Sequence, residues 1–171
     1  MRAGPCAVTL CIVFAGCGDL GLGSGGEKHQ GVFTGPLVWT VTSRVSCVTT
    51  YAVSGDIEIE LKQSGDNVTG EGSVELTQTP GPVSPAECGP APNRSWGGSG
   101  AITGTTSSFR FSHQYTASGV LVETSTATFI GELSDDVIEG TLAIDLSGSG
   151  TIEGVSTTTG GSATFNVTLR R

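Results

Sequence analysis

The sequence predicts an all-β protein, an up-and-down antiparallel β-barrel of about 8–10 strands that follows a signal peptide and a flexible tether. Apolar and polar residues alternate along most of the chain, and clusters of Gly, Ser, Asp and Asn separate the alternating segments. Glycine supplies 27 of the 171 residues and charged residues only 14%. Strong helix formers are scarce, which disfavours a helical bundle.

The amino terminus is typical of an export signal. Residues 6–16 form an uncharged apolar run, too short for the roughly 20 residues that span a bilayer but long enough for a signal-peptide core. The segment Phe14–Cys17 (FAGC) resembles the lipobox of bacterial lipoproteins, with Phe14 where that family usually has leucine. The resemblance implies that residues 1–16 are removed and that Cys17 carries a lipid, so that the membrane is a partner. The alternative is an ordinary signal peptide that is cut near this point.

The segment after the predicted lipid site is expected to be a tether. Residues 17–31 begin with a Gly/Ser-rich stretch, which behaves as a flexible spacer. Lipoproteins of diderm bacteria with aspartate directly after the cysteine tend to stay in the inner membrane, whereas this chain has Gly18 there. The resemblance therefore favours the outer membrane over the inner membrane of a bacterial cell envelope.

The cysteine count predicts one disulfide. Two of the five cysteines belong to the predicted signal peptide and Cys17 is the predicted lipid site, which leaves Cys47 and Cys88. A remaining pair in an exported protein is typical of a disulfide. The alternative is a metal or redox pair, but metal sites usually need four ligands with close spacing, and both histidines are isolated.

The predicted barrel occupies residues 32–171, and its strands follow from a period of two with one apolar face. A Thr-rich run at 120–133 is long enough to bend. The other segments share faces as follows: Leu37, Trp39 and Val41; Val45, Cys47, Thr49, Tyr51 and Val53; residues 57–61; Phe109, Phe111, His113 and Tyr115; residues 142–146; and residues 165–169.

Four clusters are predicted to be turns. They span residues 64–70, 98–104, 134–140 and 148–154, and each ends with an apolar residue, a polar residue and a glycine. Gly, Asp and Asn tolerate positive φ and so favour tight hairpin turns. The final glycine of each cluster is expected to let the sheet coil and close. Simple turn chemistry without closure is the alternative.

A proline-rich segment interrupts this rhythm at residues 79–98, which contain five prolines, Cys88 and Trp96. Proline lacks the N–H needed in a ladder, so the segment is predicted to be a loop rather than a central strand. Two interpretations remain open. The loop is a lid over the barrel mouth, or it is a structural crossover that the disulfide restrains.

In pattern, residues 32–171 resemble lipocalin-like and avidin-like barrels, which bind small apolar ligands in the barrel mouth. The predicted function is therefore that of a lipid-anchored barrel for a small apolar or amphipathic ligand. The alternative is a non-catalytic protein-interaction or structural module of the envelope, because small barrels are often filled by side chains. An apolar void of about 300 Å³ or more would favour the ligand. The candidate ligand-binding residues are the inward aromatics Trp39, Tyr51, Phe109, Phe111 and Tyr115.

Several other functions are disfavoured. The formal charge of −8 argues against nucleic acid, which requires clustered Lys and Arg. No catalytic motif is recognisable, so neither an enzyme nor a cofactor is expected, and no metal site is expected. His113 is interpreted as a hydrogen-bonded core residue. A membrane-spanning barrel is a weaker alternative, because it needs an outward apolar band and aromatic girdles, and aromatic residues make up only 6% of this chain.

Overall fold

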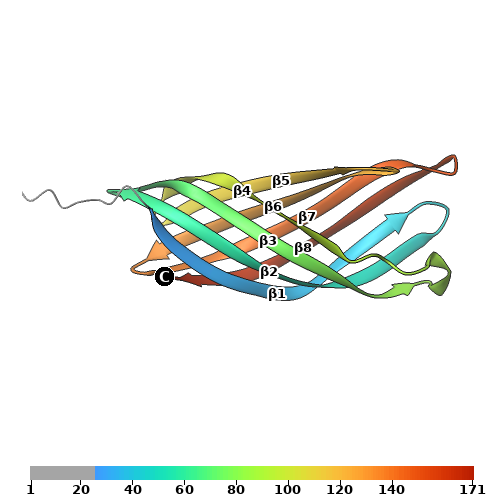
Figure 1. The fold of residues 1–171 in the computed structure, drawn as a ribbon, viewed down its shortest axis with the longest axis horizontal. Helices are drawn as coiled ribbons and strands as arrows, with labels where there is room; N and C mark the ends of the chain where they lie inside the picture. The colour runs from blue at the N-terminus through green and yellow to red at the C-terminus, as the bar shows by residue number, and fades with distance from the viewer. Residues whose placement is uncertain (1–25) are drawn as a thin grey trace, which may run out of the picture.

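Eight antiparallel strands close into an up-and-down barrel in the computed structural model, which describes residues 26–171 (Figure 1). Each strand pairs with the next in the chain, and β8 pairs back onto β1. The predicted fold class is thus confirmed, whereas the export signal and the lipid site lie outside the described residues. The strands are β1 (Glu27–Thr42), β2 (Ser46–Ser64), β3 (Asn67–Ser84), β4 (Arg94–Thr105), β5 (Ser108–Ser118), β6 (Leu121–Ser134), β7 (Val137–Ile152) and β8 (Val155–Arg170).

The observed boundaries differ from the predicted ones in two places. β1 begins at Glu27, ahead of the expected barrel start at residue 32. β3 continues to Ser84 and β4 starts at Arg94, so the proline-rich connection is shorter than expected. That connection contains one short 3₁₀ helix, Ala86–Cys88.

One of the four predicted turns is wrong, because the cluster at 98–104 lies wholly inside β4. The cluster at 148–154 contains the β7–β8 turn at its end, at residues 153–154, but Gly148 and Gly150 lie inside β7. Gly98 and Gly148 therefore stand within strands. These glycines make room for neighbouring side chains. A Cβ on Gly98 would lie 2.6 Å from Cδ2 of His113, and a Cβ on Gly148 would lie 2.5 Å from Oγ1 of Thr159.

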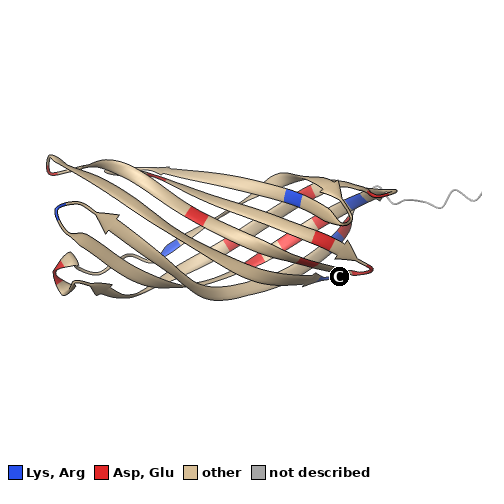
Figure 2. Ribbon diagram, turned by 180° about the vertical axis from the view of Figure 1, so that it is seen from behind, with Lys and Arg blue, Asp and Glu red and all other residues tan. Residues whose placement is uncertain are grey.

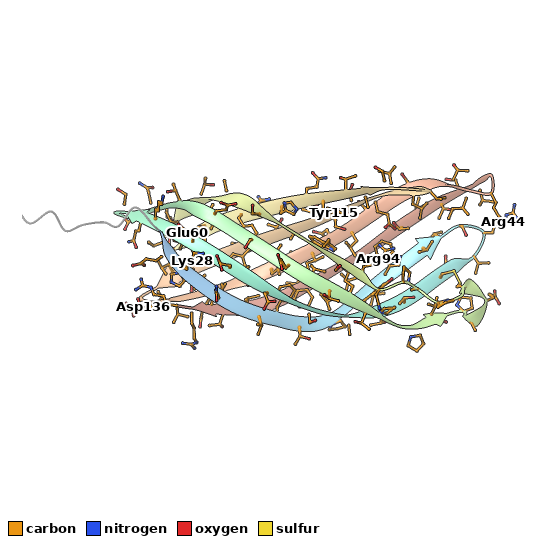
Figure 3. The ribbon with its side chains drawn as sticks, viewed as in Figure 1. Lys28, Arg44, Glu60, Arg94, Tyr115 and Asp136 are labelled. Atoms are coloured by element: carbon orange, nitrogen blue, oxygen red, sulfur yellow. A yellow bond between two sulfur atoms is a disulfide. The ribbon has the colours of Figure 1, made fainter. Side chains whose placement is uncertain are left out.

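The two ends of the barrel differ in their connections. The turn end carries the short β2–β3, β4–β5 and β6–β7 turns, the start of β1 and the C-terminus, and the loop end carries the other four connections. Charged residues gather in the half nearest the turn end (Figure 2). Lys28, Glu60 and Asp136 lie there, whereas Arg44 lies at the tip of the loop end (Figure 3).

The barrel wall has an apolar inner face and a polar outer face. Along β6, for example, Ala127 and Phe129 are buried, whereas the alternate positions 124, 126 and 128 are all threonine. Serine and threonine recur on the outward positions of β7 and β8 as well. This distribution differs from the continuous outward apolar band of a membrane-spanning barrel, because exposed apolar side chains such as Val32 and Ile130 stand between polar ones. Within residues 26–171, no helix is long and apolar enough to cross a bilayer.

Aromatic rings packed over glycines fill the turn half of the barrel. Phe111 stacks on Phe129 with centroids 5.9 Å apart, and Phe109 lies 6.2 Å from Phe129. A Cβ on Gly72 would lie 2.7 Å from Cε1 of Phe111, and a Cβ on Gly140 would lie 2.8 Å from Cε2 of Phe129. Glycines on one strand thus leave space that aromatic rings from another strand fill, and the result is a closely packed core.

The ladder between β4 and β5 is short. It pairs only residues 103–105 with 108–110, although β4 pairs with β3, and β5 with β6, along their whole lengths. We call the remaining boundary between β4 and β5 the seam. A side chain bridges it, because Nδ1 of the half-buried His113 donates to the carbonyl oxygen of Ser99 at 3.0 Å. His113 is therefore hydrogen-bonded, as expected, but it is half-buried at the seam and is not part of the core.

Candidate functional site

The structure separates the five predicted ligand-contact residues. Trp39 and Tyr51 meet in the loop half, with ring centroids 6.5 Å apart and ring planes at 77°. Phe109 and Phe111 are fully buried in the aromatic core of the turn half. Tyr115 follows on β5 along the seam and is 44% exposed. Only Trp39 and Tyr51 therefore share one cavity.

The predicted disulfide is present and shapes this cavity. Cys47 and Cys88 are bonded, with their Cα atoms 5.9 Å apart, which fastens the 3₁₀ helix of the proline-rich connection to the start of β2. The connection also receives a hydrogen bond, because the Tyr51 hydroxyl donates to the carbonyl oxygen of Pro92 at 3.3 Å. Residues 88–92 line the cavity. The connection thus forms one wall of the barrel mouth, as a lid does.

The mouth cavity has a volume of about 190 Å³ and is lined chiefly by Trp39, Tyr51, Arg94, the disulfide and the proline-rich connection. This volume is below the void of about 300 Å³ that was expected to favour a ligand, so the volume alone favours the filled-barrel alternative. The guanidinium carbon of Arg94 lies 4.0 Å from the centroid of the Trp39 ring, a cation–π arrangement. Burial raises the pKa of the Tyr51 hydroxyl, and the nearby Arg94 partly opposes the shift. Tyr51 is therefore a neutral phenol at neutral pH.

An ion pair crosses the barrel beside the cavity. Arg94 on β4 donates to both carboxylate oxygens of Glu123 on β6, at 2.8 and 3.3 Å. The two side chains are only 26% and 18% exposed. A bidentate geometry and a stacked guanidinium hold Arg94 in one place. Because its charge is matched, the pair adds directional hydrogen-bonding groups to the mouth without adding net charge.

Three polar side chains in the loop half have buried atoms without hydrogen-bond partners among the described residues. They are Gln78, with both amide atoms, Trp96, with Nε1, and Thr159, with Oγ1. Gln78 is 0% exposed and Thr159 is 7% exposed. An unsatisfied buried polar group costs about 1–3 kcal/mol, so four such atoms cost roughly 4–12 kcal/mol. Buried polar groups that the protein leaves unpaired are commonly satisfied by ordered water or by a ligand. His29 near the turn end has the same status, with both ring nitrogens unpaired among the described residues.

We call Gln78, Arg94, Trp96, Glu123 and Thr159 together the polar layer. Gln78 and Arg94 are direct cross-strand partners with both side chains inward, and Trp96 is the next inward residue on β4. Glu123 and Thr159 flank Gly148 from the two neighbouring strands, and a Cβ on Gly148 would lie 2.5 Å from Oγ1 of Thr159 and 2.9 Å from Cγ of Glu123. The polar layer lies in the loop half, next to the cavity that Arg94 also lines.

Strand periodicity did not predict the polar layer, although one of its residues breaks the apolar pattern of the sequence. The buried face of an alternating segment contains Val74 and Leu76, and the next residue on that face is the polar Gln78. The prolines obscured the same pattern at Arg94 and Trp96, which fell in the predicted loop. Glu123 lies in the Thr-rich run, where no single face was assigned.

A groove on the outer wall is the largest hollow described. It has a volume of about 840 Å³ and crosses β1 to β4, with Val32, Asp56 and Glu75 along its length. A second groove of about 710 Å³ shares these three residues and continues toward β8. Val32 is 76% exposed. Both grooves lie outside the barrel.

Comparisons with known proteins add no family or relative. No protein-family model, no curated protein and no solved structure matches the chain.

Proposed function

We propose that this chain is a lipid-anchored envelope protein whose barrel binds a small amphipathic ligand at the loop end. The observation that carries the proposal is the mouth cavity, where the rings of Trp39 and Tyr51 and the guanidinium of Arg94 lie under a disulfide-held connection. Aromatic faces favour flat or apolar groups. The small volume restricts the ligand, or the part that enters, to about one ring or a short chain.

The solid core of the turn half limits where a ligand can bind. Phe109, Phe111 and Phe129 fill that half, as the filled-barrel alternative expects. Buried polar atoms without partners occur in both halves, since both ring nitrogens of His29 near the turn end also lack them, but only in the loop half do such atoms lie beside a cavity among those described. We therefore place ligand binding in the loop half alone.

The anchor part of the proposal rests on the resemblance of Phe14–Cys17 to the lipobox. β1 starts at Glu27 at the turn end, so a lipid on Cys17 would attach the barrel by that end. Cys17→Ser should move the protein from the membrane fraction to the aqueous fraction, measured by fractionation and mass spectrometry. A variant that stays in the membrane fraction would contradict lipid attachment at Cys17.

The ligand part is tested with ethylbenzene, an apolar probe of one ring. The chain has two tryptophans, and only Trp39 lines the cavity. In ¹⁵N-labelled purified protein, ethylbenzene should shift the indole signal of Trp39 saturably. Trp39→Leu should weaken binding at least tenfold, read from neighbouring backbone amides, while Ile130→Ala on the exposed face of β6 should not. Equal binding by both variants, or no saturable shift in the wild type, would refute the mouth site.

The outer groove favours a second candidate function, that of a protein-interaction module. A photo-crosslinking residue at Val32, in the groove, should then give a discrete adduct in cells, and one at Ile130, which is also exposed but lies on β6, should not. Equal labelling at the two positions would argue against a partner in the groove.

A further inference from the structure

We infer that the ligand carries an uncharged head group that both donates and accepts hydrogen bonds, such as a primary amide or a hydroxyl, and that Gln78, Trp96 and Thr159 bind it. The inference rests on the proposed function and adds the chemical class of the ligand. Its apolar part lies on Trp39 and Tyr51 in the mouth cavity, and its head group lies past Arg94, which lines that cavity and is the cross-strand partner of Gln78. The lining of the cavity itself does not include Gln78, Trp96 or Thr159, so the head group enters only if this part of β4 moves.

The hydrogen-bonding inventory sets the class. Trp96 offers only a donor, whereas the amide of Gln78 and the hydroxyl of Thr159 each offer a donor and an acceptor. A head group without a donor would leave Oε1 of Gln78 unpaired. A head group without an acceptor would leave Nε2 of Gln78 and Nε1 of Trp96 unpaired. An amide or a hydroxyl supplies both functions.

The ion pair excludes charged head groups. Arg94 and Glu123 neutralise each other inside the layer. A carboxylate in the layer would compete with Glu123 for the guanidinium of Arg94, which Glu123 already occupies with both oxygens. An ammonium placed beside Gln78 would face Arg94, its cross-strand partner. Either ion would also have to leave water without gaining a free counter-charge.

The seam provides the wall that can yield to the head group. The part of β4 that carries Arg94 and Trp96 is paired through its backbone only with β3, because the β4–β5 ladder ends at Thr103. Toward the loop end, β4 and β5 diverge (Figure 1). Moving this part of β4 toward or away from β5 therefore breaks no β4–β5 ladder bonds, and the bonds that restrain it are from side chains, namely His113 to Ser99 across the seam and Arg94 to Glu123.

The test uses three probes of similar size on the purified protein, namely benzamide, benzoate and ethylbenzene. Benzamide should shift the indole proton of Trp96 downfield and saturably, because that N–H gains an acceptor. Benzoate should bind at least tenfold more weakly. Gln78→Met keeps the length of the side chain and removes both amide atoms, so it should weaken benzamide at least tenfold and leave ethylbenzene unchanged. Gln114→Met, at an exposed outward position of β5, is the matched control.

The outcomes separate the two claims. If ethylbenzene shifts Trp39 saturably but benzamide leaves Trp96 unmoved, the mouth site stands and the head-group inference falls, with the buried atoms serving bound water only. Equal affinities for benzoate and benzamide would also overturn it. If none of the probes binds, the proposed function falls as well. Should Gln78→Met fail to fold, the Trp96 shift and the benzoate comparison in the wild type still decide the question.

Discussion

The packing of Phe111 over Gly72 predicts a sign change in a double-mutant cycle. The Phe111 ring is fully buried and held on its other side by Phe129, at 5.9 Å, so it has no room to retreat. Gly72→Ala would place a Cβ 2.7 Å from Cε1 of the ring. Such overpacking costs about 1–3 kcal/mol. Phe111→Ala alone should cost about 3–5 kcal/mol.

In the Phe111→Ala background the same Gly72→Ala change should no longer destabilise. The added methyl enters the space that the ring vacates, and alanine in a strand is favoured over glycine by about 0.5–1 kcal/mol. The coupling energy between the two sites should therefore be roughly 1.5–4 kcal/mol, the sum of the removed clash and that preference. Gly160→Ala is the control, because the nearest atom to its Cβ, the carbonyl oxygen of Leu146, is 3.9 Å away.

Urea unfolding measures this cycle. With a slope of about 2 kcal/mol per M, Gly72→Ala should lower the midpoint by about 0.5–1.5 M in the wild-type background and raise it by about 0.25–0.5 M in the Phe111→Ala background. The slope should stay constant if the core alone has changed. An equal loss in both backgrounds would refute the argument that a ring packed over glycine fills the turn half.

Two further predictions concern stability. Replacing Cys47 and Cys88 with alanine should lower the free energy of unfolding by about 3–4 kcal/mol, because the disulfide closes a loop of roughly 42 residues. A reductant should lower the urea midpoint of the wild type by a similar amount and leave that of the variant unchanged. A wild-type midpoint that does not respond to the reductant would contradict this prediction. Burial lowers the pKa of His29 below 6.5 in the folded state, with smaller opposing effects from Glu27 and Asp136 and a supporting one from Arg171. The unfolded chain then binds the proton more readily, so this stability is complete above about pH 6.5 and is lost as the pH falls through the folded-state pKa. His29→Leu should flatten that part of the stability profile, and an unchanged slope between pH 7 and pH 5 would exclude His29 as its source.

Strand periodicity was sufficient to predict the barrel, but it did not predict where each inward residue lies along the barrel axis. Alternation identified Trp39, Tyr51, Phe109, Phe111 and Tyr115 as inward residues, with Tyr115 partly exposed. Which of them share a cavity depends on strand register and tilt, because residues on one inward face can lie at opposite ends of a barrel. Local sequence carries little of that information. The structure places Phe109 and Phe111 in the aromatic core of the turn half, and Trp39 and Tyr51 in the lining of the mouth cavity.

Glycine was the least predictable residue type. Gly65, Gly70, Gly104 and Gly154 adopt positive φ, in keeping with their predicted roles in turns and coiling. Gly98 and Gly148 stand in equally turn-like sequence but make room for His113 and Thr159. The two roles differ only in what packs against the missing side chain, and in this chain those partners come from other strands.

The ligand site at the mouth is tested most directly by native mass spectrometry of the protein extracted from its own membrane. The account predicts a wild-type protein that carries one small uncharged molecule with an amide or hydroxyl group, and this molecule should be lost from both Trp39→Leu and Gln78→Met. A wild-type mass that corresponds to the chain and its anchor alone would contradict the account, as would an adduct that survives both substitutions.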